Sequence, residues 1–429
     1  MSAVPKPAPT PMAKIFDGLK VADFTWAAAG PIITKQLADN GATVVKLEST
    51  RHPDSIRMGG PFTDNKPGLN RSGFFADFHT SKLSLALDLG HTRAIEVVRP
   101  LIEWADVVAE SFRPGVMKRW GFDYAALRRI NPRIVMLSSS LYGADGPWAM
   151  HPGYGAQGAA LAGIHTLTGW PDRPPAIPKG AYSDSVSPRF GLAALMAALI
   201  HREKTGEGQH IELSQIETTL QIVAPELLCH QVSGEVPTRQ GNRKPGSLVH
   251  GVYPCRGEES WIAIECTTKA QRAALAAVLN IDPASLGARE SDTANKPDTP
   301  DAAGAARVVG APIDAEAIDH IIAERTASHD GPTLMDALRA AGVPAGMAWK
   351  ATELLHDPVL RARHHYWSLD HPEMGRLDYN GPAYRFEKTP SELASASPCL
   401  GEHTERVLRD ILGFDDARIE ALRADGILG

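Results

Sequence analysis

The chain has little of what several common protein classes depend on. Its four cysteines, in 429 residues, include no Cys-x-x-Cys pair, so neither a zinc site nor a disulfide framework is expected and a reducing cytoplasm fits. A net charge of −6 lacks the basic excess of nucleic-acid-binding proteins. The longest apolar run, at residues 190–200, is shorter than the roughly 18 residues that cross a bilayer, so no membrane partner is expected.

Familiar catalytic motifs are missing as well. No Gly-x-Gly-x-x-Gly follows the first predicted strand, and no P-loop, His-Glu-x-x-His or Gly-x-Ser-x-Gly sequence occurs. The glycines within 143–146 and 155–158 are interpreted as turn residues. Dinucleotide binding, serine hydrolysis and a metal centre are therefore not supported.

Short apolar runs and helical patterns alternate in the first 235 residues, which predicts an α/β fold. The predicted strands lie at 18–26, 42–48, 83–89, 106–112 and 133–143. The segment 30–41, between the first two strands, has the apolar spacing of a helix and a closing glycine. Strand, helix and strand in this order imply parallel pairing and an open, Rossmann-like sheet.

Changes in composition divide the chain into four parts. Residues 1–16 form a proline-rich, disordered tail, and 17–235 form the Rossmann-like domain. Residues 240–350 are expected to form a smaller α+β domain that begins with a hairpin at 251–267 and contains an Ala/Asp/Pro-rich linker at 284–313. Residues 351–429 end in two amphipathic helices, which need a surface to pack against.

Asp184 lies between a proline-rich segment and an apolar helical run. Ser187 and Pro188 resemble an N-cap followed by a first-turn proline, which predicts a helix from 188 and leaves Asp184 in the preceding loop, near the positive end of the helix dipole. The local pattern alone favours a structural acid that binds backbone N–H groups. The alternative is a nucleophilic carboxylate, for which the small neighbours Ala181, Ser183 and Ser185 leave space.

Basic residues cluster at or just after predicted strand ends, where α/β sheets bind anionic ligands. They are Lys46, Arg51, Arg57, Lys82, Arg113, Lys118 and Arg119. Arg113 is the strongest candidate, because it follows a strand and precedes a Pro-Gly helix start.

Five segments in this order resemble the class III CoA-transferase (CaiB/BaiF) family. They are "GLKVADFTWAAAGPIITKQLADNGATVVKLE", "TSKLSLALDL", "DVVAESFRPGVMKRWGFDYAALRRINPRIVMLSSSLYGADGP", "PGYGAQGAALAGIHTLTGWPDRPP" and "REKTGEGQHIELSQIE". The resemblance implies a Rossmann-like large domain that the C-terminal segment completes, a smaller α+β domain, and an interlocked-ring dimer.

The resemblance also assigns site residues. Asp184 matches the family's nucleophile, which forms a mixed anhydride and then an aspartyl-CoA thioester, with coenzyme A as carrier and no metal. The residues that match CoA contacts are Leu87, Ser111, Phe112, Arg113 and Arg119.

Departures from the family pattern bear on the substrate. The racemase branch has a His-Asp pair where this chain has Tyr154 and Gly155, and formyl-CoA transferases have a glutamine where it has Ala28. The segment 240–267 resembles more closely the subgroup that includes benzylsuccinate-type enzymes, so succinyl-CoA is the expected donor. The expected acceptor is a bulky or aryl-substituted acid, with Ala27 to Ala29 leaving room and Trp26 and Tyr154 as walls.

Two alternatives stay open. One is an acyl-CoA racemase or epimerase of the same family, in which Asp184 would act as a base. The other is an auxiliary subunit of a hetero-oligomeric CoA-transferase, so the partner is either a second copy of the chain or a related subunit.

Overall fold

The structure, a computed structural model, describes residues 13–178, 180–244, 247–287 and 314–429. Most of the predicted tail at 1–16 and of the predicted linker at 284–313 lies outside these residues. The chain divides into two compact units: one contains residues up to 165, 177–236 and 359–429, and the other contains 166–176 and 237–358. Within the described residues, no helix is long and apolar enough to cross a membrane.

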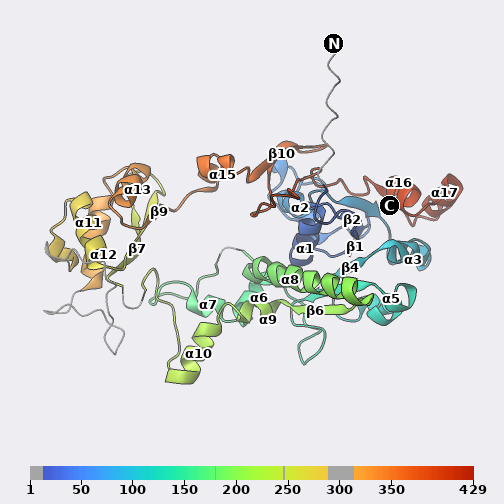
Figure 1. Cartoon of the computed structure of the whole chain (residues 1–429), viewed down its shortest axis with the longest axis horizontal. Helices are drawn as coiled ribbons and strands as arrows, with labels where there is room; N and C mark the ends of the chain where they lie inside the picture. The colour runs from blue at the N-terminus through green and yellow to red at the C-terminus, as the bar shows by residue number, and fades with distance from the viewer. Residues whose placement is uncertain (1–12, 179, 245–246, 288–313) are drawn as a thin grey trace, which may run out of the picture. The chain divides into compact units, whose positions relative to one another are not determined.

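A six-stranded parallel sheet forms the centre of the first unit (Figure 1). Its order is β3 (Leu83–Ala86), β2 (Thr43–Glu48), β1 (Lys20–Phe24), β4 (Val107–Glu110), β5 (Val135–Ser140) and β6 (His210–Ser214). The strand order reverses direction between β1 and β4. The predicted α/β class and parallel sheet are confirmed, and each strand that was predicted contains one of the observed strands.

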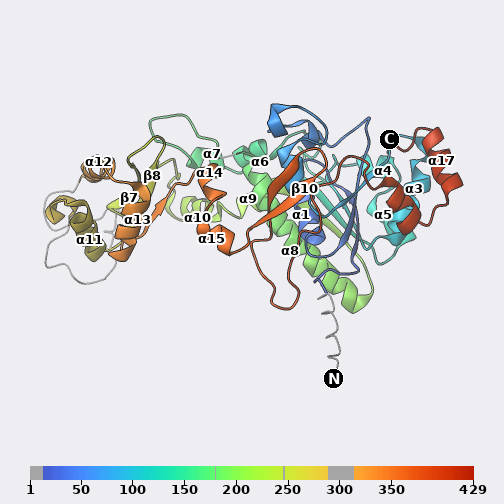
Figure 2. The ribbon, with the colours of Figure 1, turned by 90° about the horizontal axis from the view of Figure 1, so that it is seen from above.

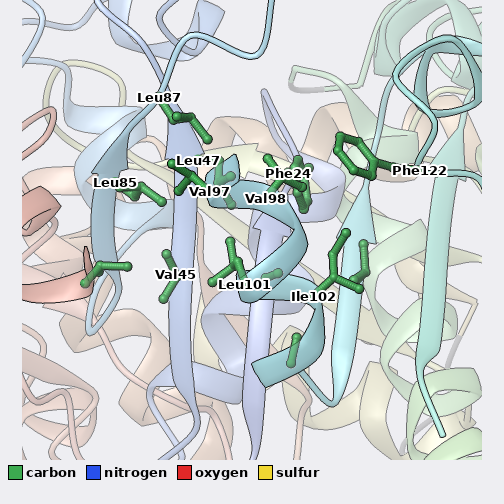
Figure 3. Packing of buried hydrophobic residues seen from close by; sticks show 14 of the residues in the cluster. Phe24, Val45, Leu47, Leu85, Leu87, Val97, Val98, Leu101, Ile102 and Phe122 are labelled. Atoms are coloured by element: carbon green, nitrogen blue, oxygen red, sulfur yellow. The ribbon is translucent and has the colours of Figure 1, made fainter. Parts of the chain in front are cut away.

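Helices cover both faces of this sheet. On one face lie α1 (Ala29–Ala38) and α8 (Tyr182–Thr205), which are neighbours in both Figure 1 and Figure 2. On the other lies α3 (Ile95–Trp104), whose Val97, Val98, Leu101 and Ile102 pack against the strands (Figure 3). That spacing places the four side chains on one face of the helix. The remaining helices up to residue 236 are α2 (Gly73–Phe78), α4 (Val116–Arg119), α5 (Tyr124–Ile130), α6 (Gly155–Leu161), α7 (Ile164–Leu167), α9 (Gln215–Leu220) and α10 (Ala224–Ser233).

The C-terminal segment completes the α3 face of the same core. It contains the hairpin β10 (Tyr366–His371) and β11 (Gly375–Asn380), then α16 (Thr404–Arg406), a π-helical turn (Val407–Ile411) and α17 (Asp416–Ala424). Val407, Leu408, Phe414, Ile419, Leu422 and Ile427 are buried in the cluster that includes Val45 and Leu101. The surface that the two C-terminal helices require is therefore in this chain.

The same segment also covers β3, the strand at one edge of the sheet. Thr404 Oγ1 accepts a hydrogen bond of 2.9 Å from the backbone N–H of Ala86, and the N–H of Asp88 donates to the carbonyl of Ile427 at 2.9 Å. Unpaired edge groups are thus satisfied by residues more than 300 positions away in the sequence.

The second unit is a small α+β structure. Its antiparallel sheet has the order β7 (Val249–Pro254), β8 (Trp261–Cys266) and β9 (Ala345–Met347), so the predicted hairpin is present with an added third strand. Its helices are α11 (Lys269–Leu279), α12 (Ala315–Thr326), α13 (Gly331–Ala340) and α14 (Ala351–Leu354), while α15 (Pro358–Ala362) begins at the division between units.

Three local predictions are wrong. A helix does not begin at 188, because α8 begins at Tyr182 and contains Pro188. Residues 155–158 form the start of α6 and not a turn. The pattern of residues 208–234 predicts a strand that runs into one long helix, whereas the structure has two helices, α9 and α10, separated near residues 221–223.

Candidate active site

A cavity of about 310 Å³ lies at the carboxyl ends of the central strands. Open parallel sheets bind ligands at this edge, at the point where the strand order reverses. The lining consists of Trp26, Glu48, Ser49, His52, Leu87, Leu89, Gly90, Phe112, Val116 and Trp120. Most of these side chains are apolar or aromatic, which suits an organic ligand more than a bare ion.

The structure brings the residues that match CoA contacts to this cavity in different ways. Leu87 and Phe112 line it, and the Phe112 ring is edge-on to Trp26 and Trp120, with centroids 5.5 and 5.2 Å away. Ser111 is bound to the cavity wall, because its hydroxyl accepts a hydrogen bond of 2.8 Å from the N–H of Trp26.

Arg113 and Arg119 lie beyond the wall, on the loop before α4 and at the end of α4. Both side chains are exposed, and neither forms an ion pair with any carboxylate of the described residues. Their guanidinium groups are available to an anionic group of a ligand in the neighbouring cavity.

Buried side chains fix the turn between β1 and α1, which carries Trp26. Lys46 Nζ donates to the carbonyl of Thr25, and the Asp54 carboxylate accepts a hydrogen bond of 2.8 Å from the N–H of Ala27. Ala27 has a φ of 66°, which is unfavourable for a residue with a side chain. Lys46 and Asp54 also pair with each other at 3.0 Å, so one buried ion pair holds both sides of Trp26.

The prediction that Lys46, Arg57 and Lys82 bind an anionic ligand is wrong. All three are fully buried and pair with carboxylates of the chain: Lys46 with Asp54, Arg57 with Glu48, and Lys82 with Asp23. Burial lowers the pKa of Lys82 to about 8 despite its partner. Burial would raise the pKa of Asp23, but Lys82 and Lys46 hold it below its ordinary value. We call these six residues, together with His79, the buried charge cluster.

Asp184 lies elsewhere on the sheet edge, in the first turn of α8. Its carboxylate lies beside Gly155, the first residue of α6, and its pKa responds to the backbone of Gly155 and to the side chain of Gln215, the first residue of α9. A Cβ atom at Gly155 would lie 2.5 Å from Asp184 Oδ2, so only glycine allows this approach. We call Asp184, Gly155, Ser183 and Gln215 the Asp184 neighbourhood.

Among the residues that the structure describes, no charged side chain pairs with the Asp184 carboxylate. Burial raises the pKa of Asp184 to about 6, and the hydrogen bonds from Gln215 and Gly155 limit this rise. The sequence places the carboxylate near a positive helix end and expects the ionised form to be favoured, whereas burial acts in the opposite direction. Asp184 is therefore mostly ionised at neutral pH and is a stronger base than an ordinary aspartate.

The earlier start of α8 has a local cause. The Ser187 hydroxyl does not cap a helix, since it is buried 2.7 Å from Thr218 Oγ1. Pro188 removes only the N–H that would bond to the carbonyl of Asp184, four residues earlier, so the helix tolerates it near its start. Asp184 consequently occupies a fixed helical position and not a loop.

Gln215 is the site residue that the sequence does not indicate. It follows β6 at the carboxyl edge of the sheet, and this position was the available signal. Tyr154, predicted as a wall, is 67% exposed. Among the described residues, no group of three or more His, Cys, Asp or Glu side chains could hold a metal ion.

Known proteins resemble this chain over nearly its whole length. CoA-transferase family III matches residues 16–404. The succinyl-CoA–D-citramalate CoA-transferase of Chloroflexus aurantiacus is 28% identical, over 96% of this chain and 98% of that protein. The acetyl-CoA:oxalate CoA-transferase of Acetobacter aceti is 32% identical, over 81% and 84%.

Solved structures agree with these relatives. A CAIB/BAIF family protein from Brucella suis has a TM-score of 0.80 and 28% identity, over 93% of this chain and all of that one. The family match at 16–404 includes residues of both units, the residues that line the cavity, and the Asp184 neighbourhood. The chain belongs to CoA-transferase family III, and it is a class III (CaiB/BaiF) CoA-transferase enzyme.

Proposed function

We propose that this enzyme moves CoA from an acyl-CoA to a carboxylic acid by way of covalent intermediates on Asp184. The observation that carries the proposal is a carboxylate with a raised pKa on which, among the described residues, the neutral groups of Gln215 and Gly155 act and no charged side chain does. A nucleophile that becomes acylated loses its charge, and neutral donors tolerate that loss better than a buried cation would.

The proposed reaction has four balanced transfers. The Asp184 carboxylate attacks the thioester carbon, the C–S bond breaks, and CoA thiolate leaves a mixed anhydride behind. The thiolate attacks the Asp184 carbonyl carbon and displaces the donor acid, which forms aspartyl-CoA. The acceptor carboxylate attacks the same carbon and releases the thiolate. The thiolate then attacks the acceptor's acyl carbon, which frees Asp184, with no net proton transfer.

For CoA itself we propose the cavity at the β1–β4 strand reversal. Leu87 and Phe112 would contact the apolar parts of the carrier, and Arg113 and Arg119 would pair with its phosphates. Ser111 would act indirectly, since its hydroxyl holds the backbone of Trp26.

As the donor we propose succinyl-CoA, which the name of the Chloroflexus aurantiacus relative includes. As acceptors, short dicarboxylic acids come first, because the relatives are named for citramalate and oxalate. The bulky or aryl-substituted acid expected from the sequence comes second. It depends on space beside Ala27 to Ala29, and Ala29 is only 3% exposed within the core.

We also propose that the active assembly is an interlocked dimer of this chain. In support, α10 has no buried residue, and its Leu227, Leu228 and Val232 are 48%, 58% and 87% exposed. A helix with such a face is commonly covered by a partner. Light scattering of the purified chain should give twice the mass of one chain, and a monomer would contradict the proposal.

Hydroxylamine trapping tests the covalent step. The protein is incubated with succinyl-CoA and hydroxylamine, which converts an activated aspartyl carbonyl to a hydroxamate, and its peptides are analysed by mass. We expect the label on Asp184 alone. An unlabelled Asp184 under conditions of measurable transfer would refute the mechanism.

The Asp184→Ala variant is the matched control. It should bind CoA as the wild type does and lose both label and transfer. A panel of short dicarboxylic acids, aryl-substituted acids and formate identifies the acceptor class. Exchange of the α-hydrogen of an acyl-CoA with solvent deuterium, without any transfer, would favour the racemase alternative instead.

A further inference from the structure

A second cavity, of about 540 Å³, lies in the C-terminal segment at the β10–β11 hairpin. The hairpin lies beside α1 (Figure 2), where Lys35 donates a hydrogen bond of 3.2 Å to the carbonyl of Asn380. The cavity shares no residue with the one at the strand reversal, and its volume is typical of pockets that hold small molecules. The described residues that line it include three arginines, one histidine and four aromatic residues, but no aspartate or glutamate.

Two of these arginines have no carboxylate partner among the described residues. Arg376 pairs with Asp370 at 3.1 Å, whereas Arg363 and Arg385 form no ion pair. The Arg385 guanidinium donates a hydrogen bond to the carbonyl of Arg363, so the two residues are neighbours in the cavity wall. Both are exposed. A ligand in this cavity therefore meets positively charged hydrogen-bond donors, which favours an anion with several acceptor oxygens.

Aromatic rings form another part of the wall. The rings of Tyr384 and Phe386 have centroids 5.1 Å apart, and the two residues are 39% and 37% exposed. The Tyr384 hydroxyl accepts a hydrogen bond of 2.9 Å from the Asn40 side chain and donates one of 3.1 Å to Gln36 Oε1. These bonds to α1 hold the ring in place without a ligand. Fixed and partly exposed rings are surfaces on which a planar ligand can stack.

We propose that this cavity binds a nucleoside phosphate, at a site separate from the cavity at the strand reversal. The base stacks on Tyr384 and Phe386, and the phosphates pair with Arg363 and Arg385. Inorganic phosphate would leave the rings uncovered, and an uncharged aromatic molecule would leave both guanidinium groups without an anion. The ligand is either a free nucleotide or the nucleotide part of a CoA molecule, because both combine a base with phosphates.

Photolabelling with 8-azido-ADP tests the site. The full chain is irradiated with the probe and digested with trypsin, and its peptides are analysed by mass. We expect label on the peptides 364–376 and 377–385, which carry cavity residues. Label in the cavity at the strand reversal falls on other peptides, so the two sites are measured separately. The experiment needs no transfer activity, and its result is therefore independent of the role of Asp184.

Competitors define the ligand. ADP should displace the label, whereas adenosine and inorganic phosphate should each require at least about tenfold higher concentrations, since each lacks one half of the contacts. Displacement by CoA would identify CoA as the source of the nucleotide, and displacement by ADP but not by CoA would identify a free nucleotide. Inorganic phosphate or benzoate that competes as well as ADP would overturn the proposed ligand class.

Variants test the residues. Arg363→Ala removes a guanidinium group that has no carboxylate partner and should weaken labelling about tenfold. Phe386→Ala, which removes a stacking ring, should weaken labelling as well. Lys388→Ala is the matched control, because it removes an exposed cation from the same loop but does not line the cavity.

Three results would overturn the proposal. They are the absence of label from residues 364–385, a label that excess ADP does not displace, and equal labelling of Arg363→Ala and Lys388→Ala. If Arg363→Ala does not fold, as judged by circular dichroism, Phe386→Ala decides, and labelling of that variant equal to the control would refute the site.

Discussion

Two regions at the carboxyl edge of the same sheet treat charge in opposite ways. The buried charge cluster under the β1–α1 turn contains three cations and three carboxylates, all at most 1% exposed, together with a histidine whose pKa burial lowers well below its ordinary value. The Asp184 neighbourhood has one carboxylate, and its partners are a peptide N–H and an amide. In the first region charged side chains pair with one another. In the second, a single carboxylate is surrounded by neutral polar groups.

The difference follows from what each region has to do. Paired charges hold the Trp26 turn in place as long as neither partner changes its charge. In the proposed mechanism Asp184 loses its charge when it is acylated, and a buried cation beside it would then be left without a partner. Neutral hydrogen-bond donors avoid that penalty, and they can also stabilise an oxyanion when the negative charge develops there.

The largest effect is expected when a cation is removed from the buried charge cluster, which tests whether its ion pairs stabilise the fold. Lys46→Met leaves Asp54 buried without its partner and releases the carbonyl of Thr25, so we expect unfolding free energy to fall by about 3–5 kcal/mol. Urea denaturation measures the change. Lys118→Met, at an exposed position, should be within about 0.5 kcal/mol of wild type, and an equally small loss for Lys46→Met would contradict the holding role.

Asp184→Asn, in contrast to Lys46→Met, is not expected to destabilise the fold at neutral pH. The pKa of Asp184 is raised in the folded state, so its stabilising contribution is present at acid pH and is lost as pH rises from about 4 through about 6. At pH 7.5 the variant should melt at or above the wild-type temperature, and the difference should vanish near pH 4. A lower melting temperature at pH 7.5 would mean that the carboxylate stabilises the fold.

Gly155→Ala is aimed at the Asp184 neighbourhood alone. The added methyl group would stand 2.5 Å from Asp184 Oδ2 and 2.6 Å from Ala181 Cβ, which forces the Gly155 N–H away from the carboxylate. We expect kcat to fall about 100-fold, as for loss of one oxyanion donor, with little change in CoA binding. Gly346→Ala, where a Cβ meets no atom within 4 Å, serves as the control and should leave kcat unchanged.

A smaller effect is expected from pH itself. In the proposed mechanism only ionised Asp184 can attack, so with a pKa of about 6 the rate should fall about tenfold for each unit below pH 6 and level off above pH 7. Steady-state kcat between pH 4.5 and 8.5 measures the profile. An acid limb near pH 4, typical of an exposed aspartate, would show that burial does not govern this carboxylate.

The exposed arginines belong to neither region, and their substitution tests the proposed binding of the CoA phosphates. Arg113→Ala should raise KM for succinyl-CoA severalfold and leave kcat nearly unchanged, with an effect that shrinks at high salt, as expected for an exposed phosphate contact. Arg128→Ala, an exposed arginine on α5, is the matched control. A change in kcat without a change in KM would exclude a binding role for Arg113.

Sequence patterns were sufficient to predict the strands of the sheet. They were insufficient to predict which groups the basic side chains bind. Runs such as Val44 to Leu47 are apolar enough to be recognised as buried parallel strands. Lys46, however, stands inside such a run, and nothing local tells whether its ammonium group points to a ligand or to Asp54, eight residues later. That outcome depends on tertiary partners: Lys46, Arg57 and Lys82, three of the seven basic residues considered for an anionic ligand, form buried ion pairs within the chain.

The candidate site was predictable through the family resemblance and not from local pattern. The pattern around Asp184 favours a structural acid, and the resemblance assigns Asp184, Leu87 and Phe112 to the site. Gln215 and Gly155 reach Asp184 from two other helices, and their role exists only once α6, α8 and α9 are packed together. The start of α8 was missed because an apparent cap, Ser187, bonds to Thr218 instead.

The late return of the chain to β3 bears on how the enzyme is made on the ribosome. The hydrophobic cluster behind the cavity needs Ile427 as well as Val45, and Leu87 in the cavity wall precedes Asp88, whose N–H bonds to Ile427. During synthesis at roughly 5–20 residues per second, the early strands wait many seconds with one face uncovered. The wall of the cavity is therefore complete only after residue 427 has been synthesised.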